Sequence, residues 1–230
     1  MGITGNDAVT PTGPMRLLVT GGTGALGRAF RPLAQAAGHR LHAPGRRELD
    51  LFDPVAVAAA ISGVDAVIHL ATRIQPLEQL GNPDVWREND RLRADASRIL
   101  VHAALANSVA TYVQPTVTFV YPSEGRASED TPVAAVPAIL RSALAAETEA
   151  DRFARDGRRG IVLRLGLLDG PGTGHDAPVR TLGASIHVSD AARALLVALS
   201  LPSGIYNVCR DGERVSNSRF TRAAGWHPER

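Results

Sequence analysis

Lysine is absent from this sequence of 230 residues, so all 25 of its basic residues are arginines. This absence excludes any chemistry that needs a lysine amine. Cysteine is nearly absent too: Cys209 stands alone, so the chain can form neither an internal disulfide nor a cysteine-rich metal site. We therefore expect no bound metal, and a reducing cytoplasm as the location.

Long apolar runs and blocks of like charge are also missing. No apolar stretch is long enough to cross a bilayer. The formal net charge is only +2, and the arginines are interspersed with acidic residues. The segment before Met15 has neither the apolar core nor the basic start of a secretory signal. We expect neither a membrane nor a nucleic acid as a partner.

The composition is that of one folded domain. Hydrophobic residues make up 44% of the chain and charged residues 21%, which suits a sizeable core under a mixed polar surface. Residues 1–14 are rich in Gly, Thr and Pro, and we expect them to form a flexible arm. Residues 15–230 are expected to form a single domain.

Short apolar runs alternate with helical patterns along most of the chain. The runs are apolar throughout instead of alternating in polarity, which is typical of strands buried on both faces. The pattern predicts an α/β fold with a doubly wound parallel sheet. We expect strands at 15–20, 40–43, 66–71, 111–120, 160–165 and 205–208, and helices at 24–37, 54–61, 83–107, 136–156 and 188–199.

A glycine-rich turn, TGGTGALG at 20–27, joins the first strand to the first helix. Gly21, Gly24 and Gly27 are three residues apart, as in turns that bring backbone amides and a helix N-terminus against a pyrophosphate. The strand–turn–helix context predicts dinucleotide binding and disfavours a merely structural turn. The predicted binding residues are Gly21, Thr23, Gly24, Ala25, Leu26, Gly27 and Arg28.

The end of the second strand determines which dinucleotide is favoured. An acidic residue in this place would bind the ribose 2′-hydroxyl of NAD(H). The sequence has Arg46 and Arg47 there instead, and Arg28 follows the last glycine of the turn. Arginines suit a 2′-phosphate, so NADP(H) is favoured over NAD(H). The alternative is that these arginines are only solvated surface residues.

Several further segments resemble the extended short-chain dehydrogenase/reductase superfamily, in its NAD-dependent epimerase/dehydratase family. The resemblance runs from residue 15 nearly to the end of the chain. It implies a Rossmann-like fold, a small-molecule substrate and a possible homodimer. The matching segments are TGGTGALG at 20–27, LDLFDP at 49–54, HLAT at 69–72, FVYP at 119–122, SEDTP at 128–132, RSALAAE at 141–147, VLRLGLLDGPG at 162–172, HVSDAARAL at 187–195, GIYNV at 204–208 and GWHP at 225–228.

The resemblance also implies roles for individual residues. Asp50 and Leu51 would flank the adenine. Leu70, Ala71 and Thr72 would pass beside the cofactor's ribose. Arg73, directly after this segment, lies where substrate contacts are usual in the family.

The catalytic positions depart from the family pattern. The family uses a Tyr and a Lys four residues apart, and aligning on Ser142 and Glu147 puts Ile139 and Ala143 in their places. A phenol needs a nearby ammonium group to exchange a proton at neutral pH, and these two residues supply neither group. The departure predicts a protein that does not use the Tyr-Lys mechanism.

The family's third catalytic group, a Ser or Thr, falls at Val117. A shift of one residue would put Thr116 or Thr118 there instead, although adjacent strand residues point to opposite faces. Tyr121 and His175 are the other candidates for moving a proton, and histidine titrates near neutrality. For both, a non-catalytic role is the competing interpretation. His69 lies in an apolar strand and is expected to be a hydrogen-bonded core histidine.

The substrate-binding portion is short. Only a brief loop separates Gly172 from His187, so the region of about 167–230 looks like a small, trimmed version of the family's C-terminal part. The leading hypothesis is a non-standard biosynthetic tailoring enzyme, whether a reductase, an isomerase or a cyclase. The alternative is a catalytically inactive NADP(H)-binding sensor or interaction subunit. A third hypothesis, loss of cofactor binding, is disfavoured by the intact glycine turn.

Overall fold

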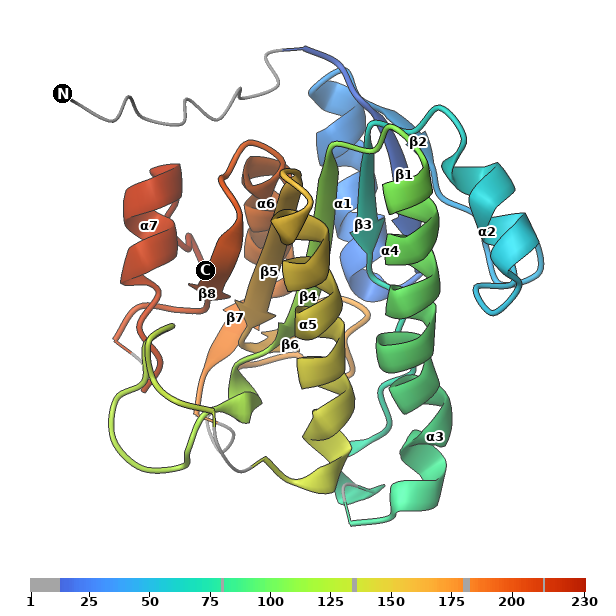
Figure 1. The fold of residues 1–230 in the computed structure, drawn as a ribbon. Helices are drawn as coiled ribbons and strands as arrows, with labels where there is room; N and C mark the ends of the chain where they lie inside the picture. Colours follow the sequence, from blue (N-terminus) through green and yellow to red (C-terminus); the bar gives the residue numbers. More distant parts are fainter. Residues whose placement is uncertain (1–12, 80, 134–135, 180–182, 213) are drawn as a thin grey trace, which may run out of the picture.

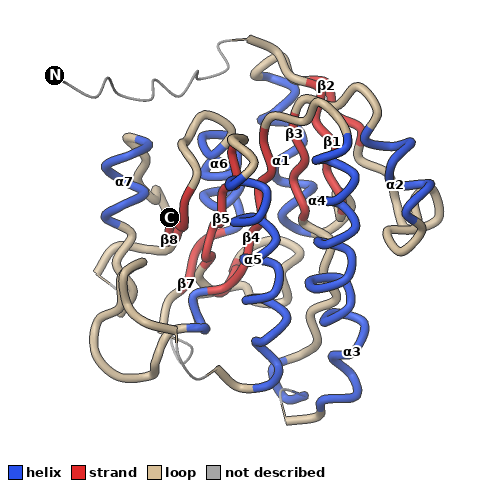
Figure 2. Tube along the Cα trace, viewed as in Figure 1, coloured by secondary structure: helices blue, strands red, loops and turns tan. Residues whose placement is uncertain are grey.

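The computed structural model describes residues 13–79, 81–133, 136–179, 183–212 and 214–230. Most of the arm expected at 1–14 therefore lies outside the described residues. The described chain is a sheet covered by helices on both faces (Figure 1). Figure 2 shows the strands as a central layer between the helices.

Six parallel strands form the main sheet, in the order β2-β1-β3-β4-β5-β8. The sequence predicted all six, which are β1 (Arg16–Thr20), β2 (Arg40–His42), β3 (Ala66–His69), β4 (Thr111–Val117), β5 (Arg159–Leu165) and β8 (Gly204–Val208). A second, two-stranded sheet pairs β6 (Leu167–Asp169) with β7 (Ser185–His187). The expected α/β class and parallel sheet are confirmed.

Helices cover the two faces of the sheet in separate groups. The helices α1 (Ala25–Ala36) and α6 (Val188–Ala198) pack on one face. The other face is covered by α2 (Pro54–Ile61), α4 (Ser97–Ala106) and α5 (Arg141–Arg155). Two further helices are α3 (Pro83–Arg91), which leads into α4, and α7 (Ser218–Ala224). The central strands are therefore buried by helices on both faces of the sheet.

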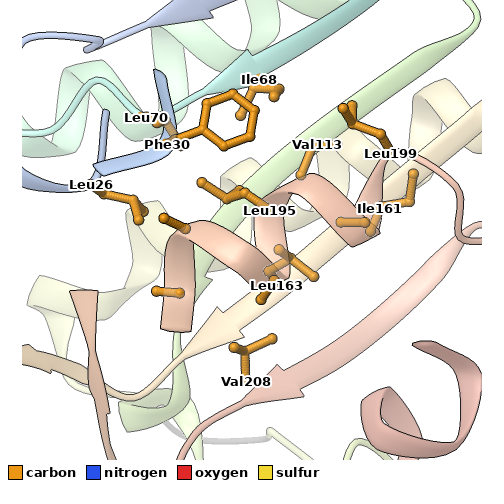
Figure 3. Packing of buried hydrophobic residues seen from close by; sticks show 14 of the residues in the cluster. Leu26, Phe30, Ile68, Leu70, Val113, Ile161, Leu163, Leu195, Leu199 and Val208 are labelled. Carbon is orange, nitrogen blue, oxygen red and sulfur yellow. The ribbon is translucent and has the colours of Figure 1, made fainter. Parts of the chain in front are cut away.

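The apolar strands supply both cores. In β1, Leu17 and Val19 face α1 and α6, while Leu18 faces α2 and α4. Figure 3 shows Phe30 of α1 and Leu195 of α6 gathered with the strand residues of the first core. This two-sided burial explains why the strands are continuously apolar.

The helix expected at 83–107 is present as one helical segment that runs from Pro83 to Ala106, but it is not α-helical throughout. A π-helical turn, Leu92–Ala96, separates α3 from α4. The carbonyl oxygen of Leu92 lies 2.9 Å from His69 Nε2. The histidine side chain of β3 therefore donates a hydrogen bond to a carbonyl oxygen of the helix. Such an insertion is a known cause of irregular helical turns.

Other boundaries also differ from the expectation. The strand expected to reach residue 120 ends at Val117, and a 3-10 turn, Thr118–Val120, follows it. The helix expected from 136 begins at Arg141, after the 3-10 turn Ala138–Leu140. The strands β6 and β7 and the helix α7 were not predicted. Each is short, and the two strands are defined by their pairing with each other.

Candidate functional site

The carboxyl ends of β1 and β3 meet at one edge of the sheet. These two strands are neighbours, although the chain first leaves β1 for β2 on the other side. Open α/β sheets bind ligands at such a reversal of strand order. The glycine turn follows β1, and the segment of Leu70, Ala71 and Thr72 follows β3, so the structure brings these two predicted segments together.

Gly21 shows how close the two segments are. Its φ is +70°, and a Cβ there would lie 2.6 Å from the backbone nitrogen of Ala71. Only glycine fits both the backbone conformation and the space. Glycine at this position therefore lets the turn after β1 lie directly against the backbone of the segment after β3.

Gly27 and Gly24, the other two glycines of the three-residue spacing, have different surroundings. A Cβ on Gly27 would lie 2.5 Å from Gly22 Cα, so this glycine lets α1 pack against the turn. Gly24 is exposed, and a Cβ on it would meet only the Gly21 carbonyl oxygen, at 3.3 Å. The side of the turn next to Gly24 is thus open toward solvent.

The N-terminus of α1 leaves its backbone donors available. No side chain caps the helix at Gly24, and no acidic residue lies in its first turn. The free N–H groups and the positive end of the helix dipole favour an anion there. Thr23 is exposed and Ala25 is half-buried beside this terminus, whereas Leu26 packs into the core. The turn therefore has the features that a pyrophosphate needs.

Arg28 lies between two glycine-rich segments. Its guanidinium donates to the carbonyl oxygen of Thr23. A Cβ on Gly172 would come within 2.5 Å of Arg28 Nη2, so the turn after β6 passes directly over this arginine. His175 closes that turn, where its carbonyl oxygen accepts from the backbone of Gly170 at 2.7 Å. The structure thus brings Arg28 and the loop of His175 together.

Arg46 and Arg73 are joined by an acidic residue that the sequence reasoning missed. Glu88 of α3 lies 2.8 Å from Arg46 Nη2 and 3.1 Å from Arg73 Nε. Glu48, in the loop after β2, accepts from the backbone nitrogen of Gly45 at 2.6 Å. Glu88 therefore links the loop after β2 to the loop after β3.

The remaining predicted cofactor residues lie around the same edge. Asp50 is exposed and accepts from the backbone of Phe52 at 2.9 Å. Leu51 is half-buried against the core under α2. Leu70 is buried in the other core, and Thr72 is exposed. Their roles toward the adenine and ribose stay predictions.

His69 is the buried, hydrogen-bonded histidine that the sequence predicted. It is 2% exposed, and its Nε2 donates to the carbonyl oxygen of Leu92 at 2.9 Å. Its Nδ1 then accepts from the hydroxyl of Thr20 at 2.6 Å. Burial lowers the pKa of His69 to about 4, because the charged form loses its hydration.

This depressed pKa makes stability depend on pH. Between about pH 6.5 and 4 the unfolded chain protonates this histidine and the folded chain does not, so acid favours unfolding. We expect the free energy of unfolding to fall by about 1.4 kcal/mol per pH unit over that window. Urea denaturation across the window measures the slope. A His69→Gln variant should show a flatter slope, and an unchanged slope would contradict this assignment.

All three tyrosines of the chain are buried, and each hydroxyl donates a hydrogen bond within the protein. The hydroxyl bonds run from Tyr112 to Gln114 Oε1 at 2.8 Å, from Tyr121 to Asn207 Oδ1 at 2.8 Å, and from Tyr206 to the Pro202 carbonyl oxygen at 3.2 Å. Burial raises the pKa of each phenol above its ordinary value. None of them has the environment that a tyrosine acid–base catalyst requires.

The two candidate hydroxyl residues at the carboxyl end of β4, Thr116 and Thr118, have different surroundings. Thr116 is buried and donates to Glu147 Oε1 at 2.7 Å, and the same carboxylate is bound by Arg164 at 2.6 Å. Thr118 is buried, and its hydroxyl has no partner among the described residues. Val117, between them, is the partly exposed residue of the three. The side chain that reaches solvent at this strand end is therefore apolar.

Ile139 and Ala143, which the sequence resemblance places at the family's tyrosine and lysine positions, lie at the start of α5. Ile139 is half-buried in the 3-10 turn before the helix, and Ala143 is fully buried in its first turn. Next to Ala143, Ser142 donates to Asp90 Oδ1 at 2.7 Å and ties α5 to α3. Within the described ranges, no group of acidic, histidine or cysteine side chains could hold a metal ion.

A second buried residue that the sequence reasoning missed is Arg93, in the π-helical turn. It is 6% exposed. It lies on the same buried helix face as Asn89, four residues earlier, and Trp86, seven residues earlier, and this spacing was the one sequence signal for its burial. The signal is weak, because arginine ordinarily occupies the polar face of a helix.

Comparison with known proteins gives consistent matches. The model of the NAD dependent epimerase/dehydratase family matches residues 17–186. A 3-diazoavenalumate denitrifying reductase from Streptomyces sp is 30% identical over 208 residues, which cover 83% of this chain and 65% of that protein. The epimerase family protein SDR39U1 of Bos taurus is 28% identical, over 92% of this chain and 80% of that protein.

Solved structures share the fold. The structure of RMD from Pseudomonas aeruginosa complexed with NADPH superimposes with a TM-score of 0.76 at 22% identity, and covers 94% of both chains. DesIV, a dTDP-glucose 4,6-dehydratase from Streptomyces venezuelae with NAD bound, gives the same TM-score at 18% identity, over 94% of this chain and 92% of that one. In the part of the chain described here, no helix has the length and apolarity to span a membrane.

Proposed function

Because the chain belongs to the NAD dependent epimerase/dehydratase family, we propose that it is a nicotinamide-dependent reductase of a non-standard kind. In this proposal, hydride goes to an acceptor that needs no proton from a tyrosine. The single observation that carries it is that Val117, Ile139 and Ala143, which the resemblance places at the three catalytic positions, are apolar. The absence of lysine and the occupied tyrosine hydroxyls support it.

The residues at the edge of β1 and β3 fit a dinucleotide. Gly21 and Gly27 shape the turn, and the open side at Gly24 leaves room for a pyrophosphate against the uncapped α1. A reduced nicotinamide bound here would supply the hydride. The protein's part is to hold the cofactor and to keep the reacting region apolar and poor in water.

The chemistry of the acceptor decides whether an acid is needed. Hydride addition to a carbonyl builds negative charge on oxygen, and this charge calls for a proton donor or oxyanion stabiliser. A diazonium group is already positive, so hydride neutralises it and gives a diazene. Loss of dinitrogen from the diazene leaves a C–H bond. The Streptomyces relative is named as a denitrifying reductase of a diazo compound, which supports an acceptor of this class.

A Tyr121→Phe variant tests this function. We expect its kcat with an aryl diazonium acceptor to stay within about threefold of the wild type, because the lost hydroxyl is buried and interacts with Asn207 and Arg164 of the protein itself. An essential acid would instead contribute about 10²–10⁴-fold. The measurement is the loss of reduced nicotinamide absorbance under saturating cofactor.

Two outcomes of the same assay would contradict the proposal. A fall of kcat by about a hundredfold in Tyr121→Phe, with cofactor affinity unchanged, would make this tyrosine the acid. Tight cofactor binding without turnover of any acceptor would favour the alternative function, a cofactor-binding sensor or interaction subunit.

The preference for NADP(H) over NAD(H) remains part of the proposal. Arg46 follows β2 and is 78% exposed, so a 2′-phosphate can reach it. We expect Arg46→Ala to weaken NADPH binding by about tenfold and NADH binding much less, since only NADPH has the phosphate. Calorimetric titration with both cofactors measures the difference.

Glu88 supplies the matched control. It pairs with Arg46 in the structure and competes with a phosphate for the guanidinium. Glu88→Gln should therefore strengthen NADPH binding while leaving NADH nearly unchanged. Equal losses for both cofactors in Arg46→Ala would count against the 2′-phosphate assignment.

A further inference from the structure

Arg93 is a buried cation without a partner. It lies in the π-helical turn Leu92–Ala96 and is 6% exposed. In the described part of the chain it makes no ion pair or hydrogen bond, and its Nε is enclosed with no acceptor. Arginines are almost never fully buried unless they are paired. The guanidinium therefore needs an anion that the described residues do not supply.

Asp90, one turn earlier, attracts Arg93 but does not neutralise it. Its Oδ1 accepts from Ser142 Oγ at 2.7 Å, and no atom of it lies within ion-pair distance of the guanidinium. Burial lowers the pKa of Arg93 to about 10, against the attraction of Asp90. Desolvation thus outweighs the electrostatic support that the arginine receives from the protein.

Arg93 belongs to a helical segment that packs against α5, the helix on which the family's catalytic positions are expected. The bond between Asp90 and Ser142 ties this helical segment to the start of α5, and the π-helical turn packs against α5. Ala143, the residue at the family's lysine position, directly follows Ser142 and is fully buried. Arg93 therefore belongs to the segment that packs beside the position where the family has its own cation.

Asn89 adds a second unused donor on the same helix. It is fully buried, its Oδ1 accepts from the backbone of Arg73 at 3.1 Å, and its Nδ2 has no partner. Asn89 and Arg93 are four residues apart, on the face that turns inward. Both unused atoms are donors, so a ligand that satisfies them must present acceptors.

We infer that Arg93, with Asn89, forms an oxyanion subsite that holds a carboxylate of the substrate. The inference rests on the proposed function, because it places this carboxylate next to the region where the acceptor reacts. A buried positive charge calls for a negative ligand more than for a neutral hydroxyl, because only an anion offsets its desolvation. We therefore expect the reductase to act on acceptors that carry a carboxylate.

The cofactor's pyrophosphate does not account for Arg93. The uncapped terminus of α1 is its site, and α1 packs on the face of the sheet opposite to α4 and α5 (Figure 1). The turn that contains Arg93 continues into α4 and packs against α5. The two cationic features therefore serve two different anions.

The experiment measures binding of benzoate, with benzamide as the neutral isostere, by calorimetry on the full chain saturated with NADP⁺. We expect benzoate to bind wild type at least about tenfold more tightly than benzamide. Arg93→Met should abolish that difference and leave the affinity for NADP⁺ unchanged. Arg93→Lys should keep part of it, because the charge remains.

A second variant covers the case in which Arg93→Met fails to fold. Asn89→Asp introduces a carboxylate one helical turn before Arg93, so we expect it to raise the Tm and weaken benzoate by about tenfold or more. No benzoate selectivity in wild type would overturn the inference. Unchanged benzoate affinity in both variants would do the same, as would a parallel loss of NADP⁺ affinity. Because no turnover is measured, the result stands apart from the test of reductase activity.

Discussion

Replacing Glu147 by alanine is expected to lower the free energy of unfolding by about 3–5 kcal/mol. Arg164 Nη2 lies 2.6 Å and its Nε 2.9 Å from the two carboxylate oxygens, and both side chains are less than a tenth exposed. Thr116 donates to the same carboxylate. The variant would leave a buried guanidinium charge without its partner. An uncompensated buried charge strongly destabilises the folded state.

Urea denaturation measures this change, and the chain offers a matched control. Asp151 pairs with Arg155 on the exposed side of the same helix, and Asp151→Ala should cost less than about 1 kcal/mol. Replacing both buried partners, Glu147→Leu with Arg164→Met, should recover much of the lost stability. Equal small losses for Glu147→Ala and Asp151→Ala would show that the buried pair is not structural.

The second large effect is on the cofactor: Gly24→Trp should weaken dinucleotide binding by at least about a hundredfold. A Cβ at Gly24 meets only one backbone oxygen of the protein, at 3.3 Å, and the residue is exposed, so we expect the fold to tolerate the substitution. Its indole would fill the open side of the turn, where the pyrophosphate is expected. Titration with NADPH and NADH measures the loss, and thermal unfolding shows that the fold persists.

Two other glycines provide the comparison. Gly81 is exposed, with nothing within 4 Å of a Cβ, so Gly81→Trp adds the same side chain without effect on binding. Gly27→Val should destabilise the fold, because its Cβ would lie 2.5 Å from Gly22 Cα. Undiminished NADPH affinity in Gly24→Trp would contradict the placement of the pyrophosphate.

The sheet and the glycine turn could be predicted from the sequence because their signals are local. Continuous apolar runs mark strands buried on both faces, and the spacing of Gly21, Gly24 and Gly27 marks a strand–turn–helix connection. The π-helical turn within the long helix could not be predicted. It lies where His69, from a strand more than twenty residues earlier, bonds to the carbonyl oxygen of Leu92.

The candidate site could likewise be predicted only in part. The segments around the cofactor edge were identified from their motifs, but the partners of their side chains were not. Glu88 pairs with two arginines from different loops, and only the folded chain brings those loops together. Arg93 was not singled out from the sequence, and its burial is seen only in the folded chain. Contacts between distant segments leave no local pattern.

The most direct test of hydride transfer without a protein acid compares two acceptors under one assay. Oxidation of NADPH is followed with an aryl diazonium compound and with the matching aryl aldehyde, and Gly24→Trp measures the uncatalysed background. We predict NADPH oxidation with release of an equal amount of dinitrogen from the diazonium compound, and none with the aldehyde. Reduction of the aldehyde by the wild type, lost in Tyr121→Phe, would contradict the proposed function.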